Sequence, residues 1–399
     1  MSKEIQGFVA DKADFLKLFA RVHDVVDKKH TRPILTHFRL CARDSKLGIS
    51  ATDLFLGIKS KIATESPAKF DILLPAKETT DRMKNLPDGL VKLTIREQNK
   101  VLIESVKQKR KFNVDGLSPA NFPVLSGYPE ECESFDIPVR VISDLIERTI
   151  FSCSQDLARP HMNGALFELE NHNRFRMVTT DGFRLTKCEL TVPTQQDLPN
   201  VSGRRRKRIK NFSLLLPLKG LHVLNKLCSD LEDDQVISFV HDKNDVYFEY
   251  FESNGADHRL SIRLPDAEFV VWQSVVQGWQ TDKCFNVRIQ AKPLIASLQA
   301  LLVDVNEKTG QVVLTFSNKK LEISTGTASD ELELFGYDSK DSQTIGFNAR
   351  YLLDALIAAS RTTDLVQLDI TNNESPIWLS AVDKTVHFLA IIMPIRIPS

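Results

Sequence analysis

Residues 162–188 read MNGALFELENHNRFRMVTTDGFRLTKC, and this stretch indicates the fold class. Leu166, Glu168 and Glu170 alternate with Phe167 and Leu169, and the alternation resumes after a polar turn, which predicts an antiparallel β-hairpin. The Asp-Gly pair at 181–182 predicts a further turn into another strand. The stretch is informative because similar sequences occur elsewhere in the chain.

The same order of elements occurs three times. The first round begins with a helix at 10–29, which strands follow. A Leu-Pro junction at 74–75 then leads into a second helix, and three more strands complete the round. The second round begins with a helix at 137–152, and the third begins near 285. Residues 51–58 (ATDLFLGI) correspond to 179–185 (TTDGFRL), and their aspartates lie 128 residues apart (181 − 53), close to 399/3 = 133. The expected fold is α+β with three repeated domains, 1–132, 133–281 and 282–399. Coincidence among common α+β patterns is the alternative.

Composition places the chain among soluble globular proteins, with 42% hydrophobic and 26% charged residues. The 52 basic and 52 acidic residues cancel, so no global field attracts nucleic acid. The six cysteines are scattered, and we find neither a signal peptide nor an apolar run of about 18 residues. We therefore expect a reduced, cytoplasmic, non-membrane protein.

Catalytic and metal-binding motifs are missing from the sequence. There is no Gly-rich phosphate loop, no G-x-S-x-G and no H-E-x-x-H, and the nine histidines are dispersed. The expectation is a non-enzyme with no catalytic residues, no metal and no cofactor. An enzyme whose site assembles from distant residues is the weaker alternative.

Four motifs carry a resemblance to a known family. MNGALFE (162–168), TTDGFRL (179–185), IGFNARYLLDAL (345–356) and MPIRI (393–397) occur in this order. The chain thereby resembles, over essentially its whole length, the bacterial DNA polymerase III beta subunit (beta sliding clamp) family. The resemblance implies a head-to-tail homodimeric ring with antiparallel sheets outside and two helices per domain facing a central hole.

The resemblance also implies partners. Such a ring encircles double-stranded DNA without reading its sequence and tethers DNA polymerase subunits, the clamp loader and other replication and repair proteins. It would act in the bacterial cytoplasm, at the nucleoid during replication. A specialised or accessory clamp with altered partner preference is the alternative within the same fold.

Size supports two chains around the duplex. A compact domain of one third of the chain has a radius of gyration of about 14 Å and an equivalent sphere roughly 36 Å across. Three such spheres leave a hole of only about 6 Å, whereas six leave about 36 Å. B-DNA is on the order of 20 Å wide, so two chains can encircle it and one cannot.

DNA contacts are expected from basic residues on the helices and on two loops. Sliding requires weak, sequence-blind contacts between Lys or Arg and phosphates. By resemblance, Lys29 stands where the family has a DNA-contacting arginine, and another contact loop holds Gln155, Arg159 and His161. The run GRRRKRIK at 203–210 is either an extra DNA or loader contact or a solvated loop. The candidates are Lys17, Arg21, Lys29, Arg82, Arg148, Gln155, Arg159, His161, Arg204, Arg205, Arg206 and Lys226.

By resemblance, the second and third domains form a hydrophobic groove for short partner peptides with anchoring Leu and Phe side chains. The matching positions are Met162, Thr180, Gly182, Phe183, Arg184, Leu185, Val270, Val275, Asn348, Tyr351, Met393, Pro394, Ile395 and Arg396. Core packing is the alternative for the apolar members. Phe183 stands where the family usually has histidine, Val270 where it has proline and Ser274 where arginine is common, so the peptide preference is expected to be shifted.

The dimer seam is expected to join the first domain of one chain to the third domain of the other. Phe112 and Val114 match the family's apolar contacts on one side, and Val303 lies in the expected partner region. Asp304 stands where an apolar residue is common, which weakens the seam or allows a charge pair with Lys111.

Overall fold

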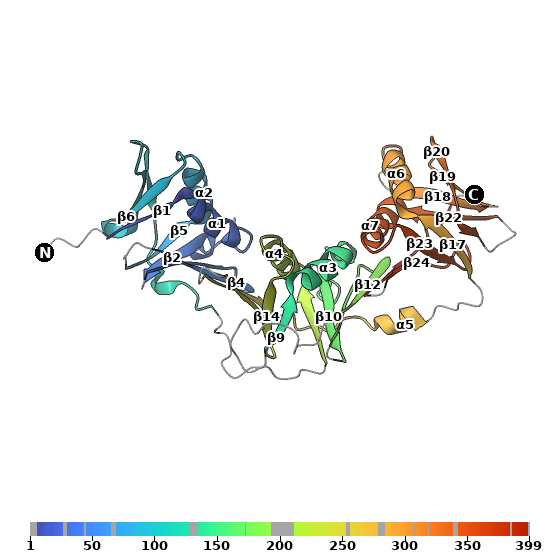
Figure 1. Cartoon of the computed structure of the whole chain (residues 1–399), viewed down its shortest axis with the longest axis horizontal. Helices are drawn as coiled ribbons and strands as arrows, with labels where there is room; N and C mark the ends of the chain where they lie inside the picture. Colours follow the sequence, from blue (N-terminus) through green and yellow to red (C-terminus); the bar gives the residue numbers. More distant parts are fainter. Residues whose placement is uncertain are drawn as a thin grey trace. The chain divides into compact units, whose positions relative to one another are not determined.

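The computed structural model describes residues 6–26, 30–43, 45–64, 69–125, 127, 134–171, 173–192, 211–252, 256–277, 284–305, 309–317, 319–337, 342–383 and 385–397. The chain divides into two compact units, whose helices and strands are labelled in Figure 1. The described part of unit 1 lies within Met1–Pro138 and Asp230–Leu264, and that of unit 2 within Val139–Asp197, Arg208–Ser229 and Pro265–Ser399. Each unit is described by itself.

The elements follow one order three times, as expected from the sequence. The first repeat contains β1 (Gln6–Asp11), α1 (Lys12–Val22), β2 (His37–Arg43), β3 (Lys46–Thr52), β4 (Leu56–Ala63), β5 (Phe70–Pro75), α2 (Ala76–Lys84), β6 (Leu90–Ile95), β7 (Lys100–Ser105) and β8 (Lys111–Asp115). The second contains β9 (Phe135–Pro138), α3 (Val139–Thr149), β10 (Gly164–Glu170), β11 (Arg174–Thr180), β12 (Arg184–Thr191), β13 (Phe212–Pro217), α4 (Leu218–Ser229), β14 (Val236–His241), β15 (Asp245–Phe251) and β16 (Asp257–Arg263).

The third repeat follows a short helix, α5 (Trp272–Gln277). It contains β17 (Phe285–Gln290), α6 (Ala291–Leu301), β18 (Gln311–Ser317), β19 (Lys320–Ser324), β20 (Ser329–Glu333), β21 (Gly336–Tyr337), β22 (Gln343–Asn348), α7 (Ala349–Ser360), β23 (Leu365–Ile370), β24 (Ile377–Val382) and β25 (Val386–Ile392). Single 3₁₀ turns occupy Pro33–Thr36, Glu97–Asn99, Pro119–Asn121 and Ile150–Ser152. None of the helices in the described segments is both long and apolar enough to span a bilayer.

Every repeat builds the same pair of antiparallel four-stranded arrangements. In the first repeat the strand orders are β1-β6-β7-β8 and β5-β2-β3-β4. The corresponding orders are β9-β14-β15-β16 and β13-β10-β11-β12 in the second repeat, and β17-β23-β24-β25 and β22-β18-β19-β20 in the third. The predicted class, α+β with three repeated clamp-type domains, is therefore confirmed.

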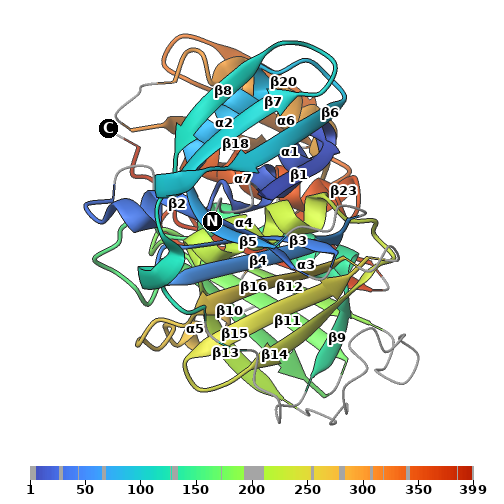
Figure 2. The same ribbon diagram turned by 90° about the vertical axis from the view of Figure 1, so that its left-hand side faces the viewer.

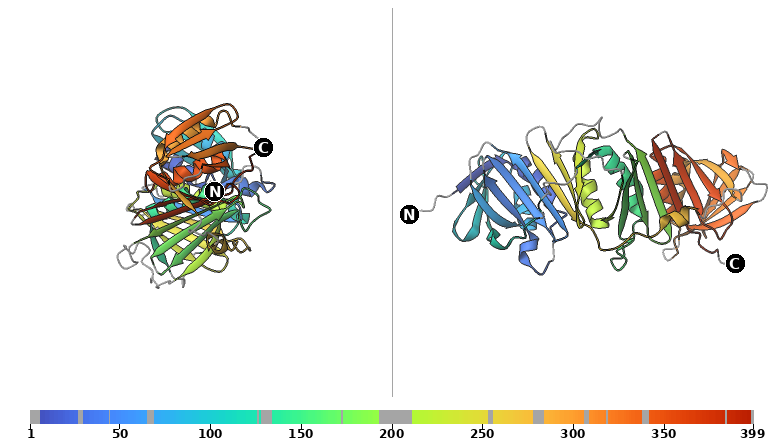
Figure 3. Two further views of the ribbon diagram at one scale, coloured as in Figure 1. Left: turned by 90° about the vertical axis from the view of Figure 1, so that its right-hand side faces the viewer. Right: turned by 90° about the horizontal axis from the view of Figure 1, so that it is seen from below.

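The sheets continue across the repeat boundaries. Strand β4 of the first repeat pairs with β16 of the second, which makes an eight-stranded sheet in unit 1 (Figure 2). Strand β12 of the second repeat pairs with β25 of the third in a nine-stranded sheet of unit 2, where green strands lie beside dark red ones in Figure 3. The repeats seen in the sequence are thus joined by main-chain hydrogen bonds.

Helix α1 shows why the helices form where they do. The Asp11 side chain accepts a hydrogen bond from the amide of Ala13 and caps the first turn. Phe15 and Phe19 are buried on one face, at helical spacing. The helix is shorter than the expected 10–29, because Ala10 and Asp11 belong to the β1–β6 ladder and the helix ends at Val22.

Helix α5 was not expected, because the text around it corresponds to the loop that ends the first repeat. Its first residue, Trp272, is buried in a cluster with Leu166, Val178, Leu185 and Ile391. The indole therefore fastens the segment 265–277 onto β10, β11, β12 and β25, and a helical turn follows.

The two aspartate turns share one hydrogen-bond pattern. In each, a threonine hydroxyl donates to the carbonyl four residues later at 2.7 Å. The following aspartate accepts, on Oδ1, the amides two and three residues later, at 2.9 and 2.6 Å for Asp53 and at 2.9 and 3.1 Å for Asp181. The correspondence of Thr52–Asp53 with Thr180–Asp181 therefore holds at the level of single atoms.

Candidate peptide-binding site

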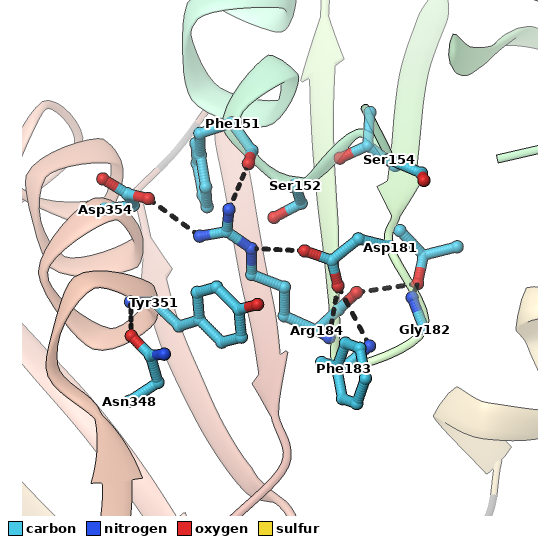
Figure 4. A network of polar contacts seen from close by, with 12 residues as sticks. Phe151, Ser152, Ser154, Asp181, Gly182, Phe183, Arg184, Asn348, Tyr351 and Asp354 are labelled. Atoms are coloured by element: carbon cyan, nitrogen blue, oxygen red, sulfur yellow. Dashed lines mark hydrogen bonds and ion pairs between the residues drawn. The ribbon is translucent and has the colours of Figure 1, made fainter. Parts of the chain in front are cut away.

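Three segments of unit 2 meet where strands β11 and β12 of the nine-stranded sheet are joined, and Figure 4 shows the first two of them. They are the β11–β12 turn, the first turn of α7 and the residues that follow β25. The amide of Met393 donates to the carbonyl of Phe183 at 3.0 Å, which joins the last segment to the first. Gly182 has φ +92°, a left-handed conformation that glycine adopts without strain.

Arg184 is the polar centre of this site. Its Nε lies 3.0 Å from Asp181 Oδ2 and its Nη1 lies 2.8 Å from Asp354 Oδ2. Nη2 donates to the carbonyl of Phe151, and the guanidinium carbon lies 4.2 Å from the ring centroid of Tyr351 (Figure 4). The β11–β12 turn, α7 and the segment after α3 therefore hold the guanidinium from three sides.

Tyr351 and Asn348 belong to the first turn of α7. Burial and the Asp181 carboxylate raise the pKa of the Tyr351 phenol. The Asn348 side chain caps α7 by accepting the amides of Arg350 and Tyr351 at 3.0 and 3.3 Å. The polar groups of this wall are thus fixed before any partner binds.

Exposed apolar side chains lie on the segments of this site and on α5, whose Trp272 packs against Leu185. Phe183 is 60% exposed, Val275 46% and Met393 44%. Val271 and Ile397 are exposed as well. A surface that combines apolar side chains with a few fixed polar groups suits an extended peptide with apolar anchors.

Several members of the expected set are structural. Leu185 belongs to the buried cluster around Trp272, and Met162 and Thr180 are buried too, so core packing describes these three side chains. Val270, Pro394 and Ile395 are half-buried and Arg396 is exposed. The amide of Ile395 donates to the carbonyl of Gly346 at 2.7 Å, which ties the segment after β25 to β22.

The expectation that Arg148 contacts DNA is wrong. Its guanidinium is buried and donates to the carbonyl of Ala358 at 3.2 Å and to the hydroxyl of Thr362 at 2.7 Å. Arg21 is likewise buried and paired with Glu252 at 2.7 Å. Both arginines join elements within their units, so neither side chain reaches a ligand in solution.

The remaining DNA candidates have mixed positions. Gln155 and Arg159 are exposed beside the half-buried His161, and Lys226 is exposed on α4. Arg82 is half-buried, pairs with Glu78 and donates to the carbonyl of Asn113. Lys17 is exposed on α1. Lys29, Arg204, Arg205 and Arg206, with the whole run 203–210, lie outside the described residues.

The expected seam residues also divide. Val114 is fully buried within its own chain, so the expectation that its side chain contacts a second chain is wrong. Phe112 is half-buried on β8, the edge strand of its sheet. Val303 is 86% exposed, and Asp304 is exposed beside it.

Sequence reasoning missed Asp354 and the Phe151 carbonyl as partners of Arg184. Asp354 follows Tyr351 by three residues on α7, which places both on one helix face, and this spacing could have indicated it. The role of Phe151 depends on folding alone. Among the described residues, no group of three or more His, Cys, Asp or Glu side chains could hold a metal ion.

Comparison with known proteins gives matches along the chain. Models of the DNA polymerase III beta subunit match with the N-terminal domain at 7–126, the central domain at 136–269 and the C-terminal domain at 282–396. The beta sliding clamp of Rickettsia felis is 26% identical over 386 residues, which cover 94% of this chain and 95% of that protein.

Solved structures give the same result. The DNA polymerase III subunit beta of Pseudomonas aeruginosa is 25% identical with a TM-score of 0.81, covering 98% of this chain and 100% of that one. The DNA polymerase sliding clamp of Bacillus subtilis, at 21% identity, shares the fold with a TM-score of 0.84 and covers 99% and 100%. Since the family models span all three repeats, the chain belongs to the DNA polymerase III beta subunit family.

Proposed function

We propose that this chain is a processivity factor for DNA polymerase, a non-catalytic sliding clamp that closes around duplex DNA as a dimer and tethers its partners. The three consecutive beta-subunit domains carry this proposal. Tethering keeps a dissociated polymerase at high effective concentration near its template, so rebinding is faster than loss. The proposed place of action is the bacterial cytoplasm. The comparisons give no support to an accessory clamp or an enzyme.

The open sheet edges support closure by a second copy. The outermost strand of one repeat's second arrangement pairs with the last strand of the next repeat, as β4 with β16 and β12 with β25. Two described strands of these types have no such partner, β20 in the third repeat and β8 in the first. Pairing β20 of one chain with β8 of another repeats the same junction and gives a head-to-tail dimer with two seams.

Charge supports the same pairing. Strand β20 carries Asp330, Glu331 and Glu333, whereas β8 begins with Lys111 directly after Arg110 and has one carboxylate, Asp115, at its other end. Opposite charges on two strand edges favour their pairing and discourage pairing of each edge with itself. The proposed seam therefore includes β20, a strand that the sequence did not single out, besides Phe112, Val303 and Asp304.

The site around Arg184 is the proposed docking site for partner peptides. Phe183, Val275 and Met393 offer apolar contact, and the fixed Arg184 and Tyr351 orient the peptide. Phe183→Ser should weaken binding of a peptide with adjacent Leu and Phe residues by about tenfold, since an aromatic contact is worth roughly 1–2 kcal/mol. Val382→Ser, at an exposed position of β24, is the control and should leave the affinity unchanged.

DNA retention tests the clamp itself. The chain is loaded on nicked circular DNA with a clamp loader and ATP, separated by gel filtration, and the circle is then linearised. A topological clamp stays on the circle at about 0.2 M salt and slides off the linear form, because weak phosphate contacts do not hold it. Equal retention on both forms, or none on the circle, contradicts the proposal.

A further inference from the structure

In each of the first two repeats, the segment that follows the last strand lies over the face of a sheet, and a cavity lies between the segment and the sheet. In unit 1 this segment is 122–125, and it covers the face of β2, β3 and β4 opposite the buried Phe38. The cavity measures about 570 Å³. We call it the basic pocket, because Arg39, Arg43, Lys46, Lys59, Lys61 and Asp71 line it.

The cations of the basic pocket outnumber its carboxylates. Arg39 holds Asp71 through two hydrogen bonds of 2.8 and 2.6 Å, and Lys61 lies 3.4 Å from Asp257. No described carboxylate forms an ion pair with the exposed Lys46 or Lys59. Partial burial, followed by the charges of Lys61 and Arg259, lowers the pKa of Lys59 against the opposing charge of Asp257.

Unit 2 contains the matching site, which serves as an internal control. The aspartate turns align Gly48 with Arg176, Lys59 with Lys187 and Lys61 with Glu189. Here Arg176 fills the centre and pairs with Glu168, Glu170 and Glu189 at 3.2, 2.9 and 2.7 Å. The guanidinium carbon of Arg176 also lies 5.2 Å from the ring of Trp272.

The two sites therefore differ in both charge and space. On the matching positions of β10, β11 and β12, three cations balance three carboxylates, and the cavity beside them measures about 320 Å³. In unit 1 a glycine, Gly48, stands at the position of the central arginine, and the cavity measures about 570 Å³. One copy is filled and neutral, and the other is hollow and basic.

Geometry indicates what would fill the hollow. Alternate residues along a strand lie about 6.6–6.8 Å apart and neighbouring strands about 4.8 Å apart, so the cations form a grid wider than one phosphate ion. An extended peptide repeats its own alternate side chains at the same 6.6–6.8 Å spacing. Carboxylates at every second residue would each meet a cation.

The pocket suits a peptide better than a nucleic acid. Proteins that bind single-stranded DNA or RNA commonly combine a basic groove with exposed aromatic side chains on which the bases stack. The one aromatic residue of the lining, Phe122, is buried, whereas the rim consists of Pro123, Val124 and Leu125. An apolar rim above a basic floor matches a segment with apolar residues between its acidic ones.

We propose that the basic pocket is a second docking site of this clamp, which binds an extended acidic segment of a partner protein with Glu or Asp at alternate positions. It lies in unit 1, whereas the site around Arg184 lies in unit 2, so the two sites can be tested independently.

The test uses the full-length protein and a fluorescein-labelled eight-residue peptide of alternating Glu and Val. Lys46→Gln/Lys59→Gln should weaken binding at least tenfold. Lys92→Gln/Lys107→Gln, which removes the same charge from exposed positions of unit 1, should change it less than twofold. Lys61→Glu gives unit 1 the same residue type as Glu189, which occupies the matching position in unit 2. This variant should also weaken binding of the peptide. Each variant should have the same unfolding midpoint as the wild type, which verifies that it is folded.

A second readout locates the peptide. Cys41 lines the pocket, so bound peptide should slow its alkylation, followed by mass spectrometry of the fragment that contains it. Equal loss of affinity in both double variants, or unchanged Cys41 alkylation, would overturn the proposal. Equal protection by single-stranded oligothymidylate or inorganic triphosphate would reassign the pocket to polyphosphate ligands and likewise overturn it. A peptide with Gln in place of Glu should not bind.

Discussion

Leu54 and Gly182 occupy the same position in two copies of one aspartate turn. Both have positive φ, +80° for Leu54 and +92° for Gly182. The hydrogen bonds of the preceding threonine and aspartate hold the backbone there in either case. Leucine in the first copy shows that the turn has room for a side chain. Glycine in the second copy therefore relieves backbone strain and does not make space.

Gly182→Ala should therefore lower the free energy of unfolding by about 1–2 kcal/mol, the cost of a left-handed L-residue. No atom lies within 4 Å of the Cβ position, so no steric clash contributes. Gly326→Ala is the matched control, since its Cβ position is also open and its φ is not positive. Urea unfolding measures both variants, and equal stabilities would refute the strain argument.

At the scale of elements, buried ionic groups connect helices to distant strands and to each other. Arg21 of α1 lies 2.7 Å from Nδ1 of His258 on β16, and His258 Nε2 lies 2.9 Å from Glu252. Arg148 of α3 donates to carbonyls at the end of α7, whose dipole favours a cation there. The contacts of the two arginines bridge more than 200 residues of sequence.

The pH dependence of unit 1 should reveal the His258 contact. Burial and the Arg21 charge lower the pKa of His258 from 6.5 to about 4. A folded pKa below the unfolded one means that stability is complete above pH 6.5 and is lost as pH falls towards about 4. The loss is on the order of 3 kcal/mol.

The lowered pKa of Glu252 also makes unit 1 less stable as pH falls, but at lower pH than His258 does. Burial by itself raises the pKa of Glu252, but the hydrogen bond and charge of Arg21 prevail and lower it. His258→Gln, which does not titrate, should flatten the stability profile between pH 6.5 and 4.5 in urea unfolding. A profile as steep as that of the wild type would show that His258 is not responsible.

Arg148→Met should lower the free energy of unfolding by about 3 kcal/mol, because hydrogen bonds from a buried charge to the α7 carbonyls are lost. Hydrogen exchange should show faster exchange of amides near the end of α7. Lys226→Met, at an exposed position of α4, should change stability by less than about 0.5 kcal/mol. If Arg148→Met were equally mild, the helix–helix contact would not stabilise the unit.

Among the described strands, β8 and β20 are open edges that correspond to edges paired elsewhere in the chain. Light scattering should therefore give twice the 45.1 kDa mass of one chain. Phe112→Asp should shift the mass towards one chain, since a carboxylate is introduced on β8. Val382→Asp, at an exposed position of β24, should leave the dimer intact. A wild-type monomer at all concentrations would exclude the β8–β20 seam.

The sequence determined the repeat order, most strand and helix positions and the aspartate turns, because hydrophobic alternation and turn chemistry act over a few neighbouring residues. It also placed Phe183, Arg184, Tyr351 and Met393 in one candidate site, but only through the resemblance to the family. Their apolar and charged character alone does not bring residues 183 and 393 together.

The tertiary structure decided which surfaces are covered. The sequence pattern of a helix does not distinguish a basic residue that faces solvent from one that, like Arg148, contacts the end of another helix. Val114 likewise fits an exposed seam in the pattern and is buried in the fold. Gly48 appears unremarkable until Arg176 is found at the matching position with its three glutamates. Burial and net charge at a site depend on segments far apart in sequence, and only packing brings those segments together.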